Sequence, residues 1–315
     1  MQLDGLLVVD KPVGPTSHDV VSRVRRILGE RRIGHTGTLD PMASGVLPLV
    51  IGKATRLAQF LNVDAKRYDA TIRLGFATDT YDAVGRPTTE RHAGPIPTRD
   101  QIEEALAAFR GTFTQQPPAF SAKKIDGQRS YRLARARQGT TNVPASPAIA
   151  TLPAPVPVTV IKLDIVEVEK ELVRVSIACS AGFYVRSLAH DIGLALGVGG
   201  HLAALRRTEA SGRTLSDAVP LSAIEEPDGA ERARAALIPL ADVLPGLPAL
   251  TLTPTGVRRA VTGCDIAFRD LVPAASGHAS ATLPPRARLL NDANNLIGIA
   301  DLTRAGLLHP VVILM

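Results

Sequence analysis

The sequence lacks tryptophan, and aromatic residues make up only 3% of its 315 residues. A protein that stacks many bases of a single strand needs more rings than this, so that class of nucleic-acid binder is disfavoured. No run approaches the roughly 20 consecutive apolar residues of a membrane-spanning helix. The first residues also lack the basic and then apolar order of a secretory signal. We therefore expect a soluble protein of the cytoplasm with no membrane partner.

Cysteine is equally scarce. Cys179 and Cys264 are far apart and form no CxxC pair, so neither a disulfide framework nor a zinc ribbon is readable. A phosphate-binding P-loop is also absent, because Gly52-Lys53 is followed by Ala54 and Leu47 stands where the first glycine of that motif belongs. We expect no metal and no cofactor.

Apolar residues make up 45% of the chain, which is enough for a sizeable core in two domains. The formal net charge is +6, with an isoelectric point near 9.6. A basic balance of this kind favours a polyanionic partner.

Apolar patterning predicts a mixture of strands and helices. Strands are expected at 6–9, 46–51, 68–74, 158–168 and 172–179, and helices at 17–28, 53–61, 98–109 and 182–197. In the first helix we expect Ser17 to be the N-terminal cap and Gly29 to follow the last turn. The Gly- and Thr-rich residues 33–45 predict a loop, and the proline-rich residues 140–157 predict an extended surface insertion.

One glycine-rich loop holds an acidic residue in an unusual setting. Gly34-His35-Thr36-Gly37-Thr38-Leu39-Asp40-Pro41 allows close approach of a ligand at its glycines, and Pro41 keeps the backbone of Asp40 extended. On these physics alone, Asp40 is a nucleophile, a general base, a metal ligand or a turn former, with the turn former favoured. The carboxylates and histidines of a metal site are not nearby.

The loop resembles the catalytic motif of the TruB family of bacterial tRNA pseudouridine synthases, G-H-T-G-x-L-D-P-x-A-x-G-x-L-P. Every fixed position matches, from Gly34 through Pro48. The resemblance implies that Asp40 is the catalytic aspartate. It also implies that His35 fills the gap left when the target nucleotide leaves the T-loop stack.

Further segments extend the resemblance. It implies that Tyr68 stacks on the flipped base and that Arg186, within Cys179–Leu188, pairs with Asp40. A nearby guanidinium would hold a carboxylate charged and oriented. The resemblance also places three substrate-binding residues at the site: Tyr184, Leu205 and Lys11. Two departures are Phe183, where the family commonly has threonine, and the insertion at 140–157.

Positive charge is concentrated in one stretch. Residues 121–139 carry six basic residues and one acidic residue, a net charge of +5. A solvated helix face usually mixes charges of both signs, so this stretch favours contact with phosphates. The stretch resembles the family's mobile thumb, expected here at 117–139. Its RNA-binding residues would include Lys123, Lys124, Arg129 and Arg132.

Together these observations predict an α+β fold, with a mixed, largely antiparallel sheet flanked by helices. Residues 1–247 would form the pseudouridine synthase domain, and residues 248–315 a small β-rich, PUA-like RNA-binding domain beyond a boundary near 239–250. The family's reaction isomerises the T-loop uridine, position 55 of tRNA, by breaking the C–N bond, rotating the base and forming a C–C bond. We expect a monomer that needs no protein partner or guide RNA.

Three other functions remain open. A non-catalytic RNA-binding or tRNA-folding protein on the same scaffold is disfavoured by the intact Asp40 and Arg186. A guide-RNA-dependent pseudouridine synthase of the archaeal and eukaryotic kind is disfavoured by the short N-terminus and the bacterial-type thumb. A glycosidase is disfavoured because its usual pair of carboxylates is not visible.

Overall fold

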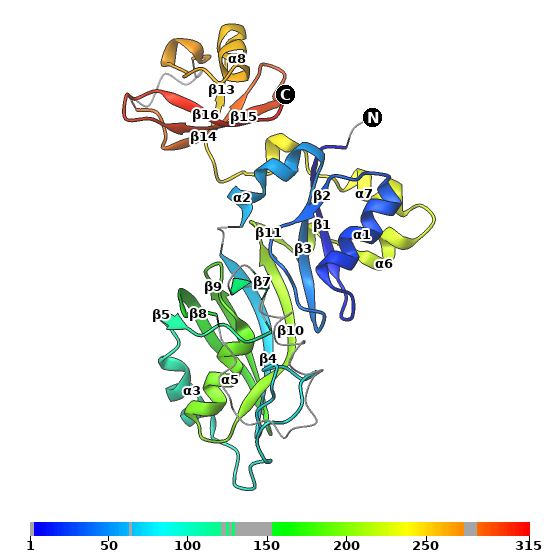
Figure 1. The fold of residues 1–315 in the computed structure, drawn as a ribbon, viewed down its shortest axis with the longest axis vertical. Coiled ribbons are helices and arrows are strands. Elements are labelled where there is room, and N and C mark those ends of the chain that lie inside the picture. The colour runs from blue at the N-terminus through cyan, green and yellow to red at the C-terminus, as the bar shows by residue number, and fades with distance from the viewer. Residues whose placement is uncertain (1–2, 63–64, 121–123, 126–127, 130–152, 274–281) are drawn as a thin grey trace.

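The computed structural model describes residues 3–62, 65–120, 124–125, 128–129, 153–273 and 282–315. These residues form an elongated molecule built on two main sheets, one of ten strands and one of four (Figure 1). The smaller sheet occupies one end of the molecule. A separate pair of short strands, β6 (Lys124–Ile125) and β7 (Gln128–Arg129), lies within the expected thumb.

The ten-stranded sheet has the order β12-β1-β3-β10-β4-β9-β8-β5, with β2 on β3 and β11 on β10. Its strands are β1 (Gly5–Lys11), β2 (Ile33–His35), β3 (Ala43–Ile51), β4 (Lys66–Leu74), β5 (Gly111–Gln115), β8 (Val156–Glu169), β9 (Leu172–Cys179), β10 (Gly200–Ala210), β11 (Arg213–Thr214) and β12 (Val219–Pro220). Only β1 with β12 and β3 with β10 pair in parallel. The predicted mixed, largely antiparallel sheet is therefore confirmed.

Helix α1 spans Ser17–Leu28 and is capped one residue before the predicted cap, Ser17. Thr16 is the N-cap, because its hydroxyl accepts from the backbone of Asp19 while Asp19 bonds back to Thr16. Ser17 is therefore the first helical residue, and the prediction that it caps the helix is wrong. Gly29 ends the helix, as predicted, and its φ of 67° places it in the left-handed region.

The expected loop at 33–45 is shorter than predicted, because β2 and β3 take residues from both of its ends. The helix expected at 53–61 is a 3₁₀ helix, Gly52–Leu57, that continues into the short α2 (Ala58–Leu61). Helix α1 packs its buried valines on β1 and β3, beside α6 (Leu221–Glu225) and α7 (Gly229–Ala235).

A second core lies beneath α3 (Arg99–Ala107) and α5 (Val185–Ala195). Strand β4 alternates between buried and more exposed residues, and Tyr68, Ala70, Ile72 and Leu74 all point into this core. Thr98 caps α3 in a capping box with Gln101. Strand β4 and helix α5 therefore place Tyr68 and the start of α5 on the same side of the sheet.

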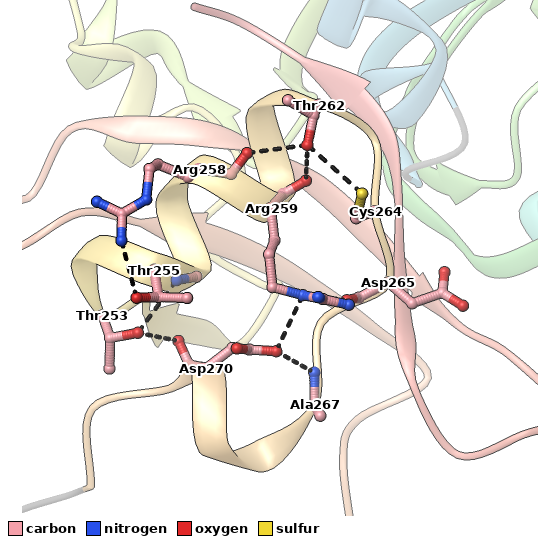
Figure 2. Close-up of polar contacts among 10 residues, drawn as sticks. Thr253, Thr255, Arg258, Arg259, Thr262, Cys264, Asp265, Ala267 and Asp270 are labelled. Atoms are coloured by element: carbon pink, nitrogen blue, oxygen red, sulfur yellow. Dashed lines mark hydrogen bonds and ion pairs between the residues drawn. The ribbon is translucent and has the colours of Figure 1, made fainter.

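The four-stranded sheet has the order β13-β14-β15-β16 and carries helix α8 (Pro254–Val261). Its strands are β13 (Ala249–Thr251), β14 (Arg286–Leu290), β15 (Leu296–Leu302) and β16 (Leu308–Ile313). Figure 2 shows Arg259 of α8 between the carbonyl of Asp265 and the buried carboxylate of Asp270. The predicted C-terminal β-rich part is confirmed.

The two sheets are joined by a shared core. Ile299, Val312 and Leu314 of the C-terminal part are buried together with Leu6 and Val46 of the larger sheet. Among the described residues, no helix is both long and apolar enough to span a lipid bilayer. The insertion predicted at 140–157 lies mostly outside the described residues, and its last two residues begin β8.

Candidate active site

A pocket opens between the β2–β3 loop, strands β4 and β10, and the start of α5. Its lining consists of Gly37, Thr38, Leu39, Asp40, Asn62, Lys66, Tyr68, Ala181, Gly182, Phe183, Tyr184, Val185, Arg186, Leu205 and Arg207. Five of the residues predicted from the sequence are in this lining: Asp40, Tyr68, Tyr184, Arg186 and Leu205. Segments that are far apart in the chain therefore meet at one pocket.

Asp40 is presented by a loop that several contacts fix. The hydroxyl of Ser17 accepts from the backbone N–H of Leu39 (2.8 Å) and donates to its carbonyl (3.1 Å). The carbonyl of Asp40 accepts from Ala43, and Pro41 accepts from Gly14. About a third of the Asp40 side chain (36%) stays exposed to the pocket. The carboxylate is thus held in place while remaining accessible to a substrate.

Arg186 lies almost completely buried behind Asp40. Its Nε is 2.9 Å from Oδ2 of Asp40, and its side chain is only 6% exposed. Its Nη2 donates to the carbonyl of Phe120 (2.8 Å) and its Nη1 to that of Thr80 (3.2 Å). Because a guanidinium is planar and these groups contact different nitrogens, they fix its orientation. Its Nε forms an ion pair with Asp40 but no well-aligned hydrogen bond to it.

A second carboxylate, which was not predicted from the sequence, lies beside Arg186. Asp82 Oδ2 lies 3.7 Å from Nη1 of Arg186, and the Asp82 side chain is nearly buried. Its other oxygen accepts from the Thr80 hydroxyl (2.6 Å) and the Val84 backbone (3.1 Å). A signal was present in the sequence: two acidic residues in the turn-rich stretch Thr78–Gly85.

Tyr68 and Leu205 supply apolar surface to the pocket from β4 and β10. Burial raises the pKa of Tyr68, and the nearby Arg207 charge offsets part of this effect. The phenol is therefore neutral at neutral pH. Lys66 also lines the pocket and is largely buried.

Arg207 is a buried cation that was not predicted from the sequence as a site residue. It is 1% exposed, its Nε donates to the carbonyl of Val46 (2.8 Å), and its Nη2 donates to that of Gly37 (3.0 Å). Burial lowers its pKa. Arg207 therefore ties β10 to the loop that carries Asp40.

Tyr184 immediately precedes α5, and its backbone is hydrogen-bonded to the side chain of Gln115 at the end of β5. The amide of Gln115 accepts from the Tyr184 N–H (2.8 Å) and donates to the Tyr184 carbonyl (3.0 Å). The Ser187 hydroxyl donates to the carbonyl of Gln116 (2.7 Å). Phe183, the departure from the family pattern, packs edge-on to Phe113. These contacts fix the start of the helix that carries Arg186.

Two predicted substrate-binding residues are not part of the pocket lining. Lys11 is fully buried, and its ammonium donates to the carbonyls of Pro12 and Pro15, both at 2.8 Å. Burial lowers the pKa of Lys11 to about 8. These contacts hold a turn and give no support to a substrate contact. His35 is half-buried at the end of β2, and burial lowers its pKa.

The predicted RNA-binding residues of the thumb are mostly beyond what the structure describes. Lys123 and Arg132 lie outside the described residues, and only the backbone of Lys124 and Arg129 is placed, in β6 and β7. Their contacts with RNA stay predictions. The described residues contain no group of three or more His, Cys, Asp or Glu side chains that could hold a metal ion.

Two family models match the chain. The TruB family pseudouridylate synthase (N terminal domain) covers residues 25–185, and the tRNA pseudouridylate synthase B C-terminal domain covers residues 186–244. The second match ends before β13, so the four-stranded sheet lies beyond both matches.

Curated relatives match most of the chain, and some match nearly all of it. The tRNA pseudouridine synthase B of Solibacter usitatus is 39% identical over 99% of this chain and 100% of its own length. That of Thermobifida fusca is 41% identical over 98% of each. That of Corynebacterium aurimucosum is 46% identical over 72% of this chain and 73% of its own length.

A solved structure titled "Crystal Structure of a Cbf5-Nop10-Gar1 Complex" has a chain with the same fold. It is 27% identical, with a TM-score of 0.70, over 99% of this chain and 85% of that chain. The ten-stranded sheet and the pocket with Asp40 thus occur in a chain that matches the relatives from Solibacter usitatus and Thermobifida fusca over nearly its whole length. The chain belongs to the TruB family of pseudouridylate synthases.

Proposed function

We propose that this protein isomerises the T-loop uridine of tRNA to pseudouridine, with Asp40 as its catalytic carboxylate. The observation that carries the proposal is the accessible Asp40 carboxylate, 2.9 Å from a buried arginine, in a pocket lined by Tyr68 and Leu205. The reaction breaks the C–N glycosidic bond, rotates the uracil and forms a C–C bond. A carboxylate serves as nucleophile in related glycosyl chemistry.

The pocket suits a base that has left its stack. An extruded uracil loses both neighbouring bases, and the ring of Tyr68 offers a new face for it. Arg186 holds the Asp40 carboxylate toward the pocket, since its own guanidinium is fixed by Thr80 and Phe120. Substrate and product of an isomerisation contain the same atoms and electrons. The reaction therefore needs no co-substrate.

A guide-RNA-dependent activity is the second candidate. It is favoured by the fold shared with a chain whose structure's title names a Cbf5-Nop10-Gar1 complex. The three relatives described above, each named tRNA pseudouridine synthase B, are 39–46% identical, compared with 27% for that chain. We therefore favour a monomer that modifies tRNA without a guide RNA or a protein partner.

The domain division is also part of the proposal. Residues 1–247 hold every described residue of the pocket, and residues 248–315 contain the whole four-stranded sheet. We assign the second part as a PUA-like domain that binds RNA away from the pocket. The thumb at 117–139 supplies further phosphate contacts, and the cytoplasm, where tRNA is modified, is the expected location.

The deciding experiment incubates the purified protein with an unmodified tRNA transcript and maps pseudouridine. We expect modification of the T-loop uridine without added RNA or protein. Asp40→Asn should lower turnover by about 10³-fold or more while tRNA affinity stays near that of the wild type. Residual turnover within about tenfold of the wild type would remove Asp40 from the chemistry. Modification only after addition of a guide RNA would favour the second candidate.

A further inference from the structure

The loop that carries Asp82 contains an aromatic residue in an unusual backbone conformation. Tyr81 has a φ of 64°, in the left-handed region that bulky side chains rarely adopt. Such a conformation costs free energy and persists only where surrounding contacts hold it. Residues of this kind gather at functional sites, so the contacts of Tyr81 are informative.

Backbone contacts fix the position of Tyr81. Its N–H donates to the carbonyl of Thr78 (3.2 Å), and its carbonyl accepts from Leu202 of β10 (3.0 Å). The Thr78 hydroxyl in turn donates to the carbonyl of Asp82 (2.8 Å). These bonds join the loop to the sheet. The contacts between the loop and α5 are made by side chains of the helix.

The side-chain contact is a ring stack. The rings of Tyr81 and His190 lie 3.8 Å apart, nearly parallel at 10°. Burial lowers the pKa of His190, so its imidazole is neutral at neutral pH. Its buried Nδ1 has no hydrogen-bond partner among the described residues. We therefore infer that stacking on Tyr81 holds the His190 ring in place.

Both partners of the stack are close in sequence to the Arg186 cluster. His190 follows Arg186 by four residues on α5, so the two side chains share one face of the helix. Tyr81 stands between Thr80 and Asp82, and both of these contact Nη1 of Arg186. The loop and the helix therefore meet at two points, the guanidinium and the ring stack.

We propose that Tyr81 and His190 are positioning residues, whose stack holds the loop against α5 so that Arg186 presents its Nε to Asp40. This inference rests on the proposed function. Neither ring is part of the pocket lining, so neither contacts the base. The stack should matter for the chemical step and little for tRNA binding.

The test uses substitutions that separate the ring from the backbone. Tyr81→Phe keeps the ring. Tyr81→Asn removes it, while asparagine tolerates the left-handed conformation better than most side chains. His190→Ala removes the partner ring from the other side. The measurements are the single-turnover rate of pseudouridine formation at saturating tRNA and the tRNA dissociation constant.

We expect Tyr81→Asn and His190→Ala each to lower the single-turnover rate by about 10- to 100-fold, as small displacements of catalytic groups do. The rate of Tyr81→Phe should stay near that of the wild type, and all dissociation constants within about threefold. Both substitutions break the same contact. The single-turnover rate of the double variant Tyr81→Asn/His190→Ala should therefore be no lower than that of the slower single variant.

A rate for Tyr81→Asn within about threefold of the wild type would overturn the proposal. A rate for Tyr81→Phe as low as that for Tyr81→Asn would also overturn it. So would a double variant whose rate falls by the product of the two single effects. If Tyr81→Asn does not fold, His190→Ala decides alone. If the wild type does not modify tRNA, the proposed function fails instead. Hydrogen exchange of residues 78–86 then tests the stack, with faster exchange expected in His190→Ala and wild-type exchange contradicting it.

Discussion

Arg186 contacts Asp40, Thr80 and Phe120 through three different nitrogens of its guanidinium. A lysine carries a single ammonium and cannot reach all three positions in fixed geometry. We expect Arg186→Lys to lower the single-turnover rate by about 100-fold or more while tRNA affinity changes little. The matched control is Arg174→Lys, since Arg174 pairs with Glu167 at the surface. Equal rates for the two variants would show that a positive charge alone is enough at position 186.

The buried Lys11 makes stability depend on pH. Burial lowers its pKa to about 8 from 10.5, so between these values the unfolded chain binds more protons than the folded protein. The contribution of this group to stability therefore rises with pH. The free energy of unfolding of the wild type relative to Lys11→Met should increase by about 2 kcal/mol from pH 7 to pH 9.5.

Urea unfolding of both proteins at the two pH values measures this difference. Subtracting the variant removes the titration of every other group, provided that the substitution leaves their surroundings unchanged. A difference that is constant or that falls with pH would contradict a lowered pKa for the Lys11 ammonium.

Helix α5 presents Arg186 correctly only if its first turn is fixed, and β5 fixes it through Gln115. The Gln115 amide is buried and bonds both backbone groups of Tyr184. Gln115→Met keeps the shape but leaves these two groups without their partner. We expect a loss of about 2–3 kcal/mol in the free energy of unfolding, together with a lower turnover rate.

Urea unfolding and single-turnover kinetics check both effects. Gln59→Met is the matched control, because Gln59 is exposed and makes only a weak local bond, 3.5 Å long, to Arg56. If Gln115→Met is as stable and as active as Gln59→Met, then α5 does not depend on this clamp.

For the whole molecule, the net charge of +5 in residues 121–139 predicts how RNA binding depends on salt. Each phosphate contact releases counterions when it forms. Neutralising Arg129 and Arg132 together should therefore make the slope of log affinity against log salt concentration shallower by about two units, if both residues contact phosphates of duplex RNA. Binding should weaken alike for many tRNA sequences, since phosphate contacts do not read bases.

The measurement is tRNA affinity at several salt concentrations for Arg129→Gln/Arg132→Gln. The control is Arg232→Gln/Arg234→Gln, which removes the same charge from the exposed face of α7. Identical slopes for the two double variants would exclude residues 121–139 from the RNA interface.

Much of this protein is determined by local sequence. The strand at 68–74, the helix beginning near Thr98 and the end of the first helix at Gly29 were predicted correctly, because each depends on near neighbours in the chain. The ion pair between Asp40 and Arg186 was also predicted, through the family resemblance of their motifs. Physical reading of the loop alone favoured a turn-forming aspartate, because a sequence does not show which distant cation faces a carboxylate.

The tertiary structure decided what lies around those motifs. Ser17 was predicted as a helix cap, but its hydroxyl is used by Leu39, 22 residues away. The roles of Asp82 and Arg207 follow from pairings across β10 and α5, and Lys11 turned out to bond its own turn. Such contacts depend on strand register and helix packing between segments far apart in the chain, which local patterns do not encode.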